Sequence, residues 1–134
     1  MKGRKAAVKA TSGALRKVPP APKDLSPQAQ TVWRRELAPL VHAEKIAAHE
    51  LPLFKSYCSA TARIDEAQAE ITRHGLLVMS ASGELKRNPA TTIQKEAIAL
   101  QARLAAEFGI TPASRNKNEG FTDRDDDTPS GLDI

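Results

Sequence analysis

The side chains of this 134-residue chain that are best placed to do chemistry are basic, and the chemistry they suit is phosphate neutralisation. Residues 1–23 carry seven basic side chains and no acidic one. The seven are Lys2, Arg4, Lys5, Lys9, Arg16, Lys17 and Lys23. A second cluster comprises Lys86 and Arg87, joined by Arg115. We expect all of these residues to contact DNA; the alternative is that they are ordinary solvated side chains.

The C-terminal segment has the opposite charge. Residues 116–134 carry six acidic and two basic side chains, and the acidic ones include Asp125, Asp126 and Asp127. With Phe121 and Leu132 as apolar anchors, this composition is typical of a disordered segment that orders on a basic partner surface. The tail could instead shield the body of the protein from non-specific DNA, a role that needs no partner.

No catalytic or metal-binding constellation is found. The three histidines, His42, His49 and His74, lack metal-ligand spacing, and a single cysteine, Cys58, excludes an internal disulfide and a cysteine-based zinc site. No phosphate-cradling glycine loop is present, so ATP hydrolysis is not expected. No apolar run approaches the ~20 residues that span a membrane. We expect a soluble intracellular protein that is not an enzyme and binds no cofactor or metal.

The segments between the charged termini are predicted to be mainly helical. Ser26 as N-cap and Pro27 at the first position predict the start of a first helix, which Pro39 should bend or end. A second helix is predicted from near His49 to His74, because Pro52 is tolerated only in a first turn. Trp33 lies among aliphatic residues at helical spacing, which indicates a core anchor rather than a base-stacking residue.

A short β-hairpin is predicted between the second helix and a third. The strand-type run 76–79 and the return run 84–87 flank a Ser-Gly turn. Asn88 and Pro89 then start the third helix. Its apolar positions form two faces: a seam of Ile93, Ala97, Leu100, Leu104 and Phe108, and a second face that includes Ile98, Ala102 and Ala105. We expect the second face to contact another subunit.

The fold class expected is therefore mainly α, with three principal helices and one hairpin. Residues 1–23 should form a basic disordered arm, residues 24–115 a helical core and oligomerisation domain, and residues 116–134 an acidic disordered tail. Aromatic residues make up only 4% of the chain. Because so thin a core buries little surface, self-association would add stability.

An ordered set of motifs resembles a known family. The string P-P-A-P-K-D-L at residues 19–25 precedes Ser26-Pro27-Gln28-Ala29 and Trp33, Asn88-Pro89 follow later, and E-F-G-I-T-P-A-S-R closes the set at residues 107–115. Together these resemble the small terminase subunit of tailed bacteriophages. The resemblance departs at residues 46–50, where the family often has Leu-Thr-x-x-Asp and this chain has Ile-Ala-Ala-His-Glu.

The resemblance implies a closed ring of subunits that acts in the host cytoplasm. Such a ring binds double-stranded viral DNA at the packaging-initiation site and recruits or regulates the large terminase subunit, which carries the ATPase and nuclease. The acidic tail is then expected to dock on that large subunit.

Two alternatives stay open on the sequence alone. A small helical DNA-binding regulator would need a helix-turn-helix pair with a short turn, and a hairpin between two helices argues against it. An oligomeric adaptor that never touches DNA would show no salt-dependent DNA binding.

Overall fold

A computed structural model describes residues 13–110 and shows a mainly helical protein. In chain order the elements are α1 (Pro27–His42), a 3-10 turn η1 (Ala48–Glu50), α2 (Leu51–His74), β1 (Leu77–Met79), β2 (Leu85–Arg87) and α3 (Pro89–Glu107). The prediction of three helices with an antiparallel hairpin between the second and the third is confirmed for this part of the chain.

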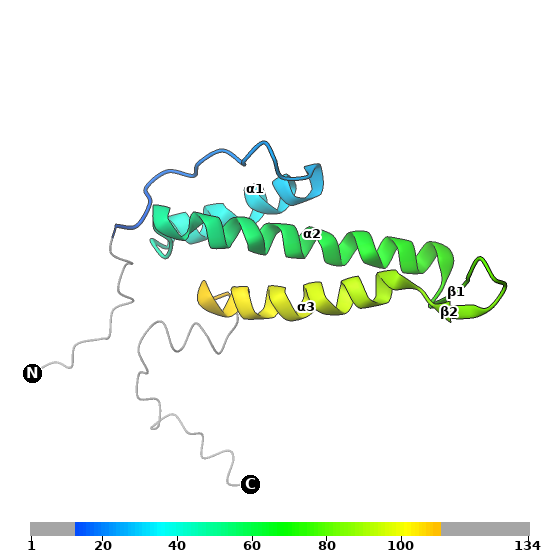
Figure 1. Cartoon of the computed structure of the whole chain (residues 1–134). Helices are drawn as coiled ribbons and strands as arrows, with labels where there is room; N and C mark the ends of the chain where they lie inside the picture. The colour runs from blue at the N-terminus through cyan, green and yellow to red at the C-terminus, as the bar shows by residue number, and fades with distance from the viewer. Residues whose placement is uncertain (1–12, 111–134) are drawn as a thin grey trace, which may run out of the picture.

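The long helix α2 packs against both other helices. Helix α3 returns beside α2 along much of its length, α1 packs on α2 as well, and the hairpin extends from the far end of the α2–α3 pair (Figure 1). Because α2 packs against both other helices, its buried residues are not a single stripe. Ala60 and Ala62 are buried as well as Phe54 and Cys58.

Four aromatic rings join the helices in the core. Phe54 of α2 contacts Trp33 of α1 edge-on at a centroid distance of 5.4 Å, and Phe108 after α3 at 5.6 Å. It also stacks on Tyr57 at 5.7 Å. The indole N–H of Trp33 donates to the backbone oxygen of Pro19 at 2.9 Å, so Trp33 is a core anchor as predicted.

The segment before α1 corrects one expectation. Residues 1–23 were expected to form a disordered arm, but residues 13–23 lie against the helical body. The Leu15 backbone N–H donates to Ile46 O at 2.8 Å, and Leu15 and Ala21 pack partly buried against the core. Few apolar residues are needed for this, because prolines restrict the segment and so lower the entropy cost of ordering it. Residues 1–12 lie outside the described part.

Helix α1 starts as predicted and continues past Pro39, which was expected to bend or end it. The hydroxyl of Ser26 accepts the backbone N–H of Ala29 at 3.1 Å, as an N-cap should. Pro39 does not end the helix but lies within it, exposed, and the helix continues to His42. The helix terminates where Glu44 takes the left-handed conformation at φ 55°, a position that usually holds glycine.

The start of α2 departs only slightly from the prediction. The 3-10 turn occupies Ala48–Glu50, so the regular helix begins at Leu51 with Pro52 in its first turn. The carboxylate of Glu50 accepts the backbone N–H of Ala47 at 2.9 Å. Glu50 therefore caps the 3-10 turn that leads into α2, although the chain lacks the Leu-Thr-x-x-Asp pattern.

Asn88 fixes the junction between α2, the hairpin and α3. Its side-chain oxygen caps α3 by accepting the Ala90 N–H at 2.9 Å, and its amide nitrogen donates to Gly75 O at 2.9 Å. Its backbone N–H donates to Leu76 O at 2.8 Å. The buried side chain thus holds the end of α2 and the start of α3 together.

Replacing Asn88 with alanine should therefore lower the free energy of unfolding by about 2 kcal/mol, because a buried cap and a cross-link between two helices are both lost. The matched control is Ser26→Ala, which removes a single exposed cap and should cost about 1 kcal/mol or less. Urea denaturation measures both. A smaller loss for Asn88→Ala than for Ser26→Ala would contradict the bridging role of Asn88.

Candidate nucleic-acid interface

Five of the predicted DNA-contacting residues lie in the described part of the chain. Arg16, Lys17 and Lys23 lie on the ordered segment before α1, and Lys86 and Arg87 lie on strand β2. All five are exposed, and none forms an ion pair with an acidic group among residues 13–110. Unpaired, hydrated cations of this kind are free to contact phosphates.

Several basic residues of the helical body are paired instead. Lys55 hydrogen-bonds the carboxylate of Asp24 at 2.6 Å, which lowers the pKa of Asp24 below its usual value. Arg73 contacts Glu70 at 3.1 Å. These pairs neutralise part of the positive charge of the body, whereas the five predicted cations on the N-terminal segment and the hairpin form no such pair.

The structure does not bring those two clusters together. Residues 14 and 15 contact residues 46 and 47, just before the start of α2, whereas the hairpin follows its last turn. At 1.5 Å per residue, the 24 residues of α2 span about 36 Å. The hairpin and the beginning of the described chain therefore lie at opposite ends of the α2–α3 pair (Figure 1).

The remaining predicted residues lie outside the described part of the chain. They are Lys2, Arg4, Lys5, Lys9 and Arg115 for DNA, and Phe121, Asp125, Asp126, Asp127 and Leu132 for the large-subunit contact. Their roles stay predictions.

The residues predicted to contact another subunit divide into two groups. Ile98 is 47% exposed and Ala102 is exposed, so both are available on the surface of α3. Ala105, in contrast, is buried in the chain's own core. The predicted seam of α3 is wrong at its first residue. Ile93 is 45% exposed instead of packed on a partner helix. Both differences arise because α3 lies slightly rotated relative to the predicted faces.

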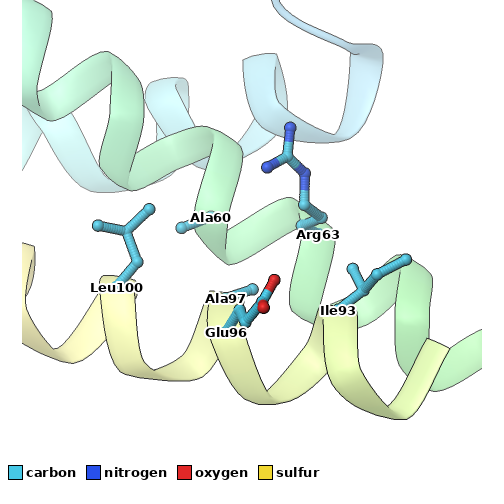
Figure 2. Close-up of a pocket in the computed structure, with 6 residues that line it drawn as sticks. All are labelled: Ala60, Arg63, Ile93, Glu96, Ala97 and Leu100. Carbon is cyan, nitrogen blue, oxygen red and sulfur yellow. The ribbon is translucent and has the colours of Figure 1, made fainter. Parts of the chain in front are cut away.

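Ile93 lines a pocket between α2 and α3. The pocket has a volume of about 390 Å³. Its lining residues are Ala60, Arg63, Ile93, Glu96, Ala97 and Leu100, drawn in Figure 2. Sequence analysis missed this site because its lining comes from two helices. The signal present in the sequence is weak: one small residue on each helix, Ala60 and Ala97, at positions that larger side chains could fill.

A polar cluster that joins α1 and α2 is structural. The carboxylate of Glu36 accepts hydrogen bonds from the Tyr57 hydroxyl and from Arg35. Burial, followed by this contact with Glu36, raises the pKa of Tyr57 to about 12. Burial likewise raises the pKa of the Cys58 thiol to about 12. Both groups stay neutral at physiological pH, so neither supplies a nucleophile or base.

No other chemistry is evident between residues 13 and 110. This part holds no group of three or more His, Cys, Asp or Glu side chains that could bind a metal ion. None of its helices is long and apolar enough to cross a membrane. The connections between consecutive helices, residues 43–50 and 75–88, are longer than the 3–4-residue turn of a helix-turn-helix motif. This disfavours the regulator alternative.

Comparison with known proteins agrees with the motif pattern. A family model described as phage terminase, small subunit, matches residues 29–125, which is more than half of the chain. The match includes α2, both strands, α3 and all but the first two residues of α1. No curated protein and no solved structure matches the chain significantly.

Proposed function

Because the chain belongs to the family of phage terminase small subunits, we propose that it binds viral DNA at the packaging-initiation site and recruits and regulates the large terminase subunit. In this role it is a non-catalytic component acting in the host cytoplasm. The large subunit supplies the ATPase and nuclease.

The family match over residues 29–125 is the observation that carries this proposal. The exposed, unpaired cations supply the physical means: Arg16, Lys17 and Lys23 at one end of the body, and the hairpin cations at the other. Each phosphate contact releases condensed counterions, which favours binding at low salt. Two clusters near opposite ends of α2, a helix about 36 Å long, would contact different phosphates of one duplex, or of a DNA that follows several subunits.

Assembly into a closed ring is the second part of the proposal. Ring assembly repeats one heterologous interface around an axis, so each chain must present two different surfaces. The exposed apolar residues on α3 and on the hairpin, including Ile93, Ile98 and Leu85, are candidates for these surfaces.

Docking of the large subunit is assigned to the acidic tail, with Phe121 and Leu132 as apolar anchors. Removing residues 118–134 should abolish stimulation of the large subunit's ATPase and leave DNA binding nearly unchanged, because the tail lies beyond the basic clusters. ATPase assays with the cognate large subunit measure this. A matched control replaces Asp125, Asp126 and Asp127 with asparagine and keeps both anchors, which separates the charges from the apolar contacts.

The shielding alternative gives the opposite pattern. If the tail only repels non-specific DNA, its removal tightens DNA binding and preserves ATPase stimulation. That result would refute docking by the tail.

A further inference from the structure

One face of the β-hairpin is apolar and exposed. In the antiparallel register Met79 pairs with Leu85 and Leu77 pairs with Arg87. Residues directly opposite share a face, and residues two apart on a strand lie on the same side. Leu77, Met79 and Leu85 therefore form one apolar cluster, and they are 56%, 65% and 65% exposed.

Nothing in the described part of the chain covers this cluster. Val78, on the opposite face of the hairpin, is the half-buried member of β1. A two-stranded hairpin is only marginally stable alone, and an exposed apolar patch commonly marks an interaction site. The cluster formed by Leu77, Met79 and Leu85 is therefore expected to be covered in the assembled protein.

A receptor of matching character lies on the same chain. Ala60 and Ala97 form buried parts of the pocket between α2 and α3, Leu100 is half-buried, and Ile93 is exposed beside them (Figure 2). The small side chains of Ala60 and Ala97 leave a space between α2 and α3 that larger side chains would fill. Its volume of about 390 Å³ exceeds the ~150 Å³ that accommodates a benzene ring, so several aliphatic side chains fit.

The charged residues of the two surfaces allow one ion pair between them. Arg87 lies on the apolar face of the hairpin and has no ion pair in the described chain. Glu96 and Arg63 both line the pocket, and Glu96 likewise has no ion pair among residues 13–110 (Figure 2). An Arg87–Glu96 contact would orient the hairpin in the pocket more than it would add affinity.

The hairpin does not fill the pocket of its own chain. It projects beyond the ends of α2 and α3, whereas the pocket lies along the packed part of the pair (Figures 1 and 2). The apolar cluster and the pocket are thus two different, unoccupied surfaces of each copy. A contact between them is heterologous, and its repetition generates a ring or a filament.

We propose that the hairpin of one copy docks its apolar cluster, Leu77, Met79 and Leu85, into the α2–α3 pocket of a second copy. The inference rests on the ring assembly in the proposed function and specifies its interface. The proposal also gives two neighbouring cations different roles. Arg87 takes part in the subunit contact, while Lys86, on the opposite face of the hairpin, stays available to DNA.

Complementation between two variants tests this contact. Leu85→Asp disables the hairpin and Ile93→Asp disables the pocket, and both positions are exposed enough for the helical fold to persist. Each variant alone should be monomeric in native mass spectrometry. Mixed in equal amounts, they should form heterodimers, because the intact hairpin of Ile93→Asp fits the intact pocket of Leu85→Asp. Leu53→Asp, at a leucine about as exposed as Ile93 and outside both surfaces, should assemble like the wild type.

Absence of heterodimers in the mixture would overturn the proposal, as would wild-type assembly by either single variant. If the wild type assembles and binds DNA while complementation fails, only this interface is wrong. A wild type that stays monomeric both free and on DNA overturns this interface and the ring together.

An engineered disulfide gives a second reading. Mixing Leu85→Cys with Ile93→Cys under mild oxidation should yield covalent dimers of the two variants. Cys58 should not form a disulfide in this test, because it is fully buried and burial raises the pKa of its thiol to about 12. Cross-linking of Leu85→Cys only to itself would contradict docking into the pocket.

Discussion

Removing residues 2–12 is expected to lower the slope of log K for DNA binding against log salt concentration by about 3 to 4 units. The deletion removes four cations, Lys2, Arg4, Lys5 and Lys9, and each phosphate contact contributes about 0.9 to the slope. Between 50 and 200 mM salt, the lost part corresponds to roughly a 100-fold change in affinity. Fluorescence anisotropy over a salt series measures it.

The deletion is designed to spare the fold. It stops short of Leu15, whose backbone and side chain contact the body, so helical circular dichroism should not change. A matched full-length control replaces the same four cations with glutamine and should show the same loss of slope. An unchanged slope would mean that the arm does not touch DNA. In that case the phosphate contacts would have to come from Arg16, Lys17 and Lys86.

Phe54→Ala is expected to lower the free energy of unfolding by about 3–5 kcal/mol. The ring is fully buried and contacts three other aromatic rings from all three helical regions, so truncation leaves a cavity at their junction. Its neighbour Leu53 is 48% exposed, and Leu53→Ala should cost less than about 1 kcal/mol.

Urea unfolding at one fixed protomer concentration should be used, since assembly adds to the apparent stability. Equal losses for Phe54→Ala and Leu53→Ala would contradict the central position of Phe54.

Local signals made most of the fold predictable. The pairs Ser26-Pro27 and Asn88-Pro89 each start a helix, as predicted, because a capping side chain followed by proline favours a first turn. Trp33 and Phe108 were correctly assigned to the core from helical spacing. These features depend on neighbours within a few residues, and such neighbours are readable in the sequence.

Features that depend on tertiary contacts could not be predicted in the same way. The order of residues 13–23 depends on Ile46 and Trp33, which are distant in sequence. The end of α1 depends on Glu44 adopting a conformation that glycine usually takes. The burial of Ala105 and the exposure of Ile93 depend on the rotation of α3 about its axis, which apolar spacing alone fixes only loosely.

Competition binding tests most directly whether this chain recognises viral DNA for packaging. The purified full-length protein is titrated at physiological salt with duplex from the packaging-initiation region of its phage and with unrelated duplex of equal length. Tighter binding to the initiation region, with salt-dependent binding to both, is the predicted result. Equal affinity for the two duplexes, or no binding to either, would contradict it.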